Sequence, residues 1–126
     1  MKVDLVIDLQ FGSTGKGAIC GYLGRTRPYD MAVTANMPNA GHTYCADSRR
    51  KWVFKVLPSS IVQRTVKYAM IGPGAVFDKE RLLMEWASVP LVDHKELYIH
   101  ECAVVLHPDH KEGERHLDKI GSTKQG

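Results

Sequence analysis

The chain has 126 residues, 44% of them apolar, and its 17 Lys and Arg against 14 Asp and Glu give a net charge of +3. This size suits one compact domain, and the scattered basic residues give no support to nucleic-acid binding. No apolar stretch approaches the roughly 20 residues of a membrane span. The three cysteines are widely spaced and form no CxxC pair, which excludes a disulfide framework or a zinc site as the first interpretation. We therefore expect a protein of the reducing cytoplasm that binds neither nucleic acid nor membrane.

The N-terminal part of the chain predicts a strand, a turn and a helix in that order. The apolar, partly β-branched run over 3–9 is typical of a buried parallel strand. Glycines punctuate the following turn, and a short helix is expected over 16–23, ending near Gly24.

The middle of the chain predicts several short strands and one further helix. Strands are expected over 30–35, over 67–71, and as a hairpin of 43–46 with 52–57. Asp78 is a typical N-cap for the helix that Pro90 ends.

The segment 97–117 predicts further strands and one exposed helix. The segments 97–100 and 103–106 indicate a strand pair or one bent strand, and 108–117 indicates a charged helix. Together with the preceding elements, this succession predicts an α/β fold.

The run DLQFGSTGKG, residues 8–17, is the first candidate site. A glycine-rich turn that opens a helix gathers backbone N–H groups and the positive end of the helix dipole around one point, which suits a phosphate. Lys16 can reach phosphate oxygens as a point charge. Gly12 is only three residues before Gly15, and Gly17 follows the lysine, so the run is not an ordinary P-loop. The alternative is that the glycines merely form a tight turn.

The run NAGHT, residues 39–43, is the second candidate site. Gly41 lets the backbone approach a ligand, and His42 can act as a general acid or hydrogen-bond donor near neutral pH. A single histidine beside glycine is also a common loop residue. Asp8 is either a hydrogen-bonded structural carboxylate or a base or metal ligand close to the first loop.

The chain ends on IGSTKQG, which has the composition of a second anion-binding turn. We therefore expect the chain to be the N-terminal portion of something longer, or to be completed by another chain.

Five runs in this order, QFGSTGKG, NAGHT, LPSSI, IGPGAVFD and IGSTKQG, resemble the N-terminal part of the adenylosuccinate synthetase family over nearly the whole chain. The resemblance implies an α/β fold with a mostly parallel sheet and helices on both faces, in a ligase that commonly works as a homodimer. It implies that L-aspartate is joined to C6 of a purine monophosphate, after phosphoryl transfer from a nucleoside triphosphate with Mg²⁺ activates the 6-oxygen. The chain would then hold a phosphate loop over 8–17, a second loop over 36–43 and a phosphate-binding turn over 121–126.

The resemblance also implies roles for single residues. His42 would be the general acid or donor on the phosphoryl group and the 6-oxygen, the Gly41 carbonyl a magnesium ligand, and Asn39 a contact to the purine monophosphate. The 5′-phosphate would be bound by Ser122 and Thr123. The residues that would hold the triphosphate are Gly12, Thr14, Gly15, Lys16 and Gly17.

Position 13 departs from the family pattern, because Ser13 stands where the family has an acid that takes the proton from N1 of inosine monophosphate and ligates magnesium. Serine is a poor base, so either the protein is inactive or its substrate differs next to N1. The phage branch of the family, the aminodeoxyadenylosuccinate synthetases, acts on deoxyguanylate (dGMP), whose 2-amino group beside N1 would crowd an aspartate. Serine is smaller and both donates and accepts hydrogen bonds.

The resemblance therefore favours dGMP as the substrate, with Ser13 setting specificity and touching magnesium, and with Asp8 or a water accepting the proton. The location would be the host cytoplasm if a phage encodes the chain, and the triphosphate would be ATP, dATP or GTP. Two alternatives stay open: an ordinary adenylosuccinate synthetase that uses inosine monophosphate, and a nucleotide-binding fragment without catalysis.

Overall fold

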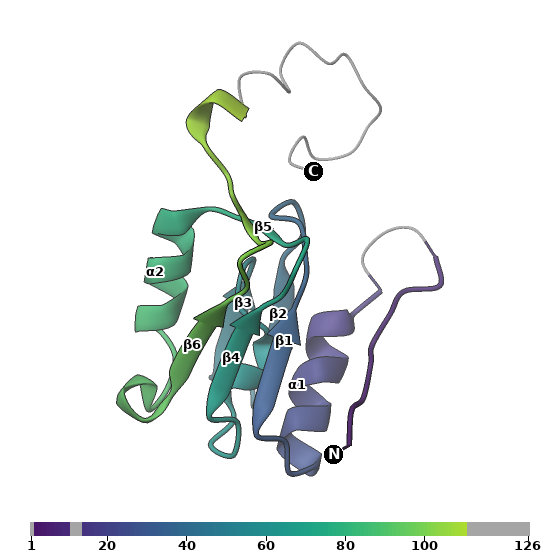
Figure 1. Ribbon diagram of the computed structural model, residues 1–126. Coiled ribbons are helices and arrows are strands. Elements are labelled where there is room, and N and C mark those ends of the chain that lie inside the picture. The colour runs from purple at the N-terminus through teal and green to yellow at the C-terminus, as the bar shows by residue number, and fades with distance from the viewer. Residues whose placement is uncertain (1, 11–13, 111–126) are drawn as a thin grey trace.

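A computed structural model describes residues 2–10 and 14–110 of the chain (Figure 1). Helices, strands and single 3-10 turns (η) alternate along it. In chain order these elements are α1 (Lys16–Thr26), β1 (Met31–Thr34), β2 (His42–Cys45), β3 (Lys51–Phe54), η1 (Ser59–Val62), β4 (Tyr68–Ile71), β5 (Val76–Phe77), α2 (Lys79–Ala87), η2 (Val92–His94), β6 (Glu96–Ile99) and β7 (Val104–Val105).

The strands form one parallel sheet and two small strand pairs. β1, β4 and β6 pair in that order, all parallel, and Tyr68 lies opposite Met31 on one side and Glu96 on the other. β2 and β3 form an antiparallel hairpin, which lies behind the sheet in Figure 1. β5 pairs with β7 in parallel. The expected α/β fold with a mostly parallel sheet is confirmed.

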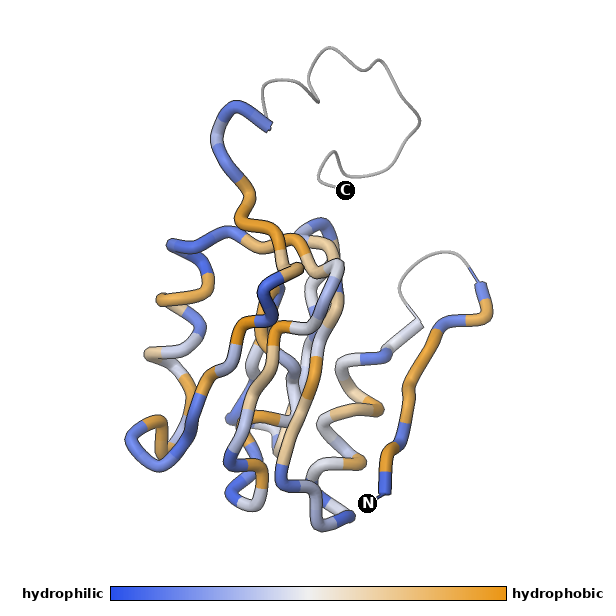
Figure 2. The backbone as a smooth tube through the Cα atoms, in the orientation of Figure 1, coloured by the Kyte–Doolittle hydropathy of each residue, from blue (hydrophilic) through white to orange (hydrophobic). Residues whose placement is uncertain are grey.

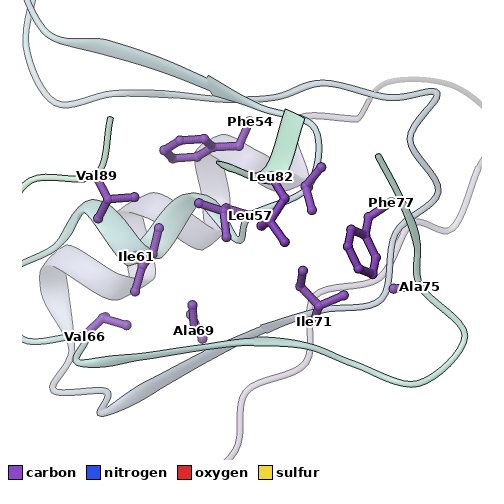
Figure 3. Close-up of a cluster of buried hydrophobic side chains, with 12 residues drawn as sticks. Phe54, Leu57, Ile61, Val66, Ala69, Ile71, Ala75, Phe77, Leu82 and Val89 are labelled. Atoms are coloured by element: carbon purple, nitrogen blue, oxygen red, sulfur yellow. The ribbon is translucent and has the colours of Figure 1, made fainter. Parts of the chain in front are cut away.

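The core lies between one face of the sheet and the two segments, 54–66 and 75–89, that connect its strands. Ala69 and Ile71 of β4 are fully buried there, whereas Met31 and Val33 on the other face of β1 are exposed. Within the described residues the packing is thus one-sided. The side chains that meet the buried face, drawn in Figure 3, include Phe54, Leu57, Ile61, Val66, Phe77, Leu82 and Val89.

The first strand predicted over 3–9 does not form, so this prediction was wrong. Residues 2–8 adopt neither helix nor strand and run beside α1 (Figure 1). Figure 2 draws most of the backbone of this segment in orange, the colour of apolar residues. Four of the apolar side chains between residues 3 and 9 face solvent, with exposed fractions of 72% for Val3, 81% for Leu5, 63% for Ile7 and 93% for Leu9.

Ion pairs explain where this segment lies. Asp4 contacts Arg27 and the Tyr29 hydroxyl at the end of α1, and Asp8 contacts Lys16 at its start. A strand exists only with a neighbouring strand to take its backbone hydrogen bonds, and here the segment is held against a helix instead.

The other predicted elements hold with shifted ends or changed partners. α1 runs to Thr26 instead of ending near Gly24, because Gly24 is buried against Ser60 inside the helix contact. Asp78 is the N-cap of α2 and accepts a 2.9 Å hydrogen bond from the Arg81 N–H, as predicted.

The two last strands form, but not with each other. β6 pairs with β4 and β7 pairs with β5, so the prediction of one strand pair or one bent strand was wrong. The last part of the helix predicted over 108–117 and the turn predicted over 121–126 lie outside the described residues. Among the residues that the structure describes, no helix is both long enough and apolar enough to cross a membrane.

Candidate active site

Gly15, which belongs to the first candidate loop, is the N-cap of helix α1. Gly15 has a φ of +87°, a left-handed conformation that glycine adopts without steric cost. No side chain of the described residues caps this helix end. Uncapped N–H groups and the helix dipole favour an anion at such a position.

Lys16 at this helix start is paired with Asp8. The carboxylate of Asp8 contacts the Lys16 ammonium through one oxygen and accepts a hydrogen bond from the Thr14 hydroxyl through the other. The two ionic side chains are 30% and 19% exposed. Lys16 can exchange Asp8 for phosphate oxygens when it binds a phosphate, and this exchange costs little because the pair is partly solvated. These three residues line a concave surface together with Val6, Ile7, Leu9, Gln10 and Ile19.

His42 is the first residue of β2 and pairs with Phe54 of β3. Its ring is half-buried, and Nε2 lies 2.9 Å from Nδ2 of Asn36 in a hydrogen bond. Burial lowers the pKa of His42, and the nearby charge of Lys16 lowers the pKa further. The ring is therefore neutral at pH 7, with one N–H donor and one acceptor nitrogen.

Gly17 brings the first loop and His42 together. It is buried, and a Cβ placed on it would lie 2.8 Å from the backbone and Cβ of His42. One turn later Gly21 approaches the ring of Tyr44 in the same way. Gly17, which the sequence predicts to bind the triphosphate, also lies in the contact between α1 and β2. The four-residue spacing of the two glycines is the signal that would have indicated this contact.

Asn39 and Gly41 are exposed in the loop before β2, where a ligand can reach them. A Cβ added to Gly41 would come no closer than 3.4 Å to Val53, so the backbone there is open on one side. The candidate residues Gly12, Ser13, Ser122 and Thr123 lie outside the described residues. Their roles stay predictions.

Two buried polar residues near the site were missed by the sequence analysis. The Ser59 hydroxyl donates a 2.6 Å hydrogen bond to the carbonyl of Gly17. The carboxylate of Glu85, 4% exposed, accepts hydrogen bonds from the backbone N–H groups of three consecutive residues, Lys55, Val56 and Leu57, at 2.7–3.0 Å. The signal for Glu85 was its place one residue before Trp86 and three after Leu82, on the apolar side of α2.

The fold and the site together define a class of protein. The loop 36–41 follows the carboxyl end of β1, and the start of α1 packs beside it, so the candidate groups gather at the edge where parallel α/β sheets bind ligands. A helix start with uncapped N–H groups and a lysine in its first turn is typical of α/β proteins that bind phosphorylated ligands.

Comparison with known proteins narrows this class to one family. Residues 5–126 match the family model described as adenylosuccinate synthetase, and the chain belongs to that family. The chain is 51% identical over 129 residues to N6-succino-2-amino-2′-deoxyadenylate synthase of Vibrio phage phiVC8, covering 99% of this chain and 38% of that protein. It is 35% identical over 136 residues to adenylosuccinate synthetase of Parabacteroides distasonis, covering 100% of this chain and 31% of that protein.

A solved structure is also similar. It is the succinoaminodeoxyadenylate synthetase of cyanophage S-2L bound to dGMP and dATP as an energy donor, with a TM-score of 0.83 and 37% identity over 94% of this chain and 33% of that one. The chain thus spans about a third of the length of the relatives it matches.

Proposed function

We propose that this chain belongs to a ligase that forms a C–N bond between L-aspartate and C6 of dGMP, at the expense of a nucleoside triphosphate. The observation that carries the proposal is the greater identity of the chain to a phage N6-succino-2-amino-2′-deoxyadenylate synthase than to an adenylosuccinate synthetase. The cyanophage relative, bound to dGMP and dATP, supports dATP as the donor among ATP, dATP and GTP.

The proposed reaction has two steps. The 6-oxygen of dGMP attacks the terminal phosphorus of the triphosphate and the diphosphate leaves, while N1 gives up its proton. The amine of L-aspartate then attacks C6 and the 6-oxygen leaves as inorganic phosphate. The products are the succino-amino-deoxyadenylate, the nucleoside diphosphate and phosphate.

The first step needs groups that hold the triphosphate next to a donor on the transferred phosphoryl group. The start of α1, with Gly15 and Lys16, suits the phosphates, together with the predicted ligands Gly12, Thr14 and Gly17. His42, neutral and fixed by Asn36, would donate its remaining N–H to the charge that develops between the phosphoryl group and the 6-oxygen. Asn39 would bind the purine monophosphate, with its 5′-phosphate held by Ser122 and Thr123.

Magnesium fits the donor chemistry of this site, because the groups offered are oxygens, which a hard divalent cation prefers. Across residues 2–10 and 14–110 no three His, Cys, Asp or Glu side chains converge as ligands. The exposed Gly41 carbonyl and the Ser13 hydroxyl would instead bind Mg²⁺ beside the phosphate oxygens. When bound, the ion would neutralise charge on the triphosphate.

Ser13 and Asp8 would divide the work of the acid that the family carries at position 13. Ser13 would leave room for the 2-amino group of dGMP, and Asp8 or a water would accept the N1 proton. Both oxygens of Asp8 now face Lys16 and Thr14. Transfer of Lys16 to the phosphates would free one oxygen for a proton, so the same exchange that binds the triphosphate would prepare the base.

The chain would contribute the phosphate loop over 8–17, the loop over 36–43 and the turn over 121–126 to a synthetase domain that works as a homodimer in the host cytoplasm. Its partners would be the small-molecule substrates, without nucleic acid or membrane. The second candidate function is an ordinary adenylosuccinate synthetase acting on inosine monophosphate, which the 35% identity to the Parabacteroides protein supports less strongly.

Turnover by the protein at its natural length tests the proposal. With L-aspartate and dATP, we expect a higher kcat/KM for dGMP than for inosine monophosphate. Ser13→Asp should lower kcat/KM for dGMP by roughly 10- to 200-fold, the penalty of a misfitting group in a specificity pocket. Ser13→Ala, which keeps the space, is the matched control and should retain the preference for dGMP. A wild-type preference for inosine monophosphate would overturn the proposal.

A further inference from the structure

We infer that Ser59 is a positioning residue that fixes the start of α1 against His42, and so sets where the triphosphate lies relative to that histidine. The ligand named here rests on the proposed function. The positioning itself rests on contacts within the chain.

The hydroxyl of Ser59 is buried and hydrogen-bonded to helix α1. Ser59 is 2% exposed, and its Oγ donates to the carbonyl oxygen of Gly17 at 2.6 Å. That carbonyl belongs to the first turn of α1, directly after Lys16. The bond therefore links η1 to the turn whose N–H groups and lysine are assigned to phosphate, across 42 residues of sequence.

Gly17 also packs against His42. The missing side chain of Gly17 brings its backbone against the backbone of His42, where a Cβ would approach to 2.8 Å. The first turn of α1 thus contacts both Ser59 and His42 through Gly17. A shift of the first turn away from Ser59 would change its distance from His42.

Ser59 and His42 also belong to one rigid frame. His42 pairs with Phe54 of β3, and the chain continues from Phe54 through 55–57 into Ser59. The buried carboxylate of Glu85 binds the three N–H groups of 55–57. The hairpin that carries His42 and the turn that carries Ser59 are therefore fixed relative to each other, and α1 docks against both.

Gln63 supplies a natural comparison. Its Nε2 donates a 3.2 Å hydrogen bond to the carbonyl of Gly21, one turn further along α1. Both bonds run from the η1 region to a carbonyl of α1, but only the Ser59 bond reaches the turn beside Lys16 and His42. If Ser59 merely added stability, loss of either bond would have similar consequences.

Steady-state kinetics of the protein at its natural length distinguishes a positioning role of Ser59 from a contribution to stability alone. We expect Ser59→Ala to lower kcat/KM for the triphosphate by about 5- to 10-fold, the effect of one lost hydrogen bond on the reacting geometry. Gln63→Ala should lower the melting temperature comparably and change kcat/KM by less than about twofold. Ser59→Cys replaces the hydroxyl by a somewhat larger thiol that donates weakly, so its kcat/KM should lie between those of wild type and Ser59→Ala.

The outcomes that overturn the inference are equal losses of kcat/KM in Ser59→Ala and Gln63→Ala, or a Ser59→Cys variant that matches wild type. Hydrogen exchange without nucleotide decides the matter independently of activity. The Ile19 N–H, which bonds to Gly15 at 3.1 Å in the first turn, should exchange faster in Ser59→Ala and not in Gln63→Ala. An unchanged rate in Ser59→Ala rejects the positioning role. Absence of turnover by wild type would count against the proposed function alone, since the exchange comparison still tests Ser59.

Discussion

Residues 3–9 and strand β4 have sequences that both favour a strand, yet only β4 forms one. β4 lies between β1 and β6, and its residues Ala69 and Ile71 are fully buried. The segment 3–9 presents Leu5 and Leu9 to solvent and is tied to α1 by acidic side chains. The difference teaches that apolar periodicity predicts a strand only where hydrogen-bonding neighbours and a core are available.

The largest expected effect lies on the packed side of this comparison, at Glu85. Glu85→Ala should leave the N–H groups of Lys55, Val56 and Leu57 buried without their acceptor and Arg81 without its 2.7 Å ion pair. We expect a loss of about 3–5 kcal/mol in the free energy of unfolding, measured by urea denaturation. Glu80→Ala, an exposed acid on the same helix, is the control and should cost less than about 1 kcal/mol. A loss below about 1 kcal/mol for Glu85→Ala would contradict the structure.

A matched pair of leucines tests the two regions directly. Leu57 is fully buried and Leu5 is 81% exposed. Leu57→Ala should lower the free energy of unfolding by about 2–5 kcal/mol, because it removes buried methyl groups and leaves a cavity. Leu5→Ala should change it by less than about 0.5 kcal/mol. Similar losses for both variants would mean that the segment 3–9 is packed in solution.

The smallest expected effect concerns the contacts of Asp4 with Arg27 and Tyr29. Hydrogen bonds from Tyr29 and then Arg27 lower the pKa of Asp4 below its ordinary value of 3.8. Because the pKa of Asp4 is lowered in the folded protein, the stabilisation from these two contacts is fully present above pH 3.8. It is lost as the pH falls through the lowered pKa.

We expect amide NMR signals of residues 2–8 to stay constant from pH 7 to pH 5 and to shift only below pH 4. Asp4→Asn should weaken the attachment of the Asp4 end of this segment to Arg27 and Tyr29 at all pH values without changing the melting temperature appreciably. Asp47→Asn, in the turn between β2 and β3, is the control that should leave the signals of 2–8 unchanged. A shift of those signals near neutral pH would show that another group holds the segment.

The local sequence predicted most of the sheet but few of the buried contacts that position the site. β1, β4 and the hairpin were predictable because each is a short β-branched or aromatic run beside a turn, and Asp78 was predictable as a cap. The partners of β6 and β7 were not, because pairing depends on where distant segments lie. The segment 3–9 failed for the same reason.

The prediction of the site has the same limit, because contacts between distant segments cannot be read from local sequence. Lys16 and His42 were predicted as candidate residues, and the structure brings their loops together through Gly17. Ser59 and Glu85 were missed, because a serine after proline is ordinary and the place of a glutamate on the apolar side of α2 does not reveal its partners. Their roles follow from burial and from partners more than 25 residues away.

The transfer of oxygen from substrate to phosphate tests the central claim most directly. dGMP labelled with ¹⁸O at the 6-position is incubated with L-aspartate, dATP, Mg²⁺ and the protein at its natural length, and the inorganic phosphate is analysed by mass spectrometry. The account predicts that the phosphate released carries the ¹⁸O label, because the 6-oxygen leaves with the phosphoryl group. Formation of the succino product with unlabelled phosphate would contradict it.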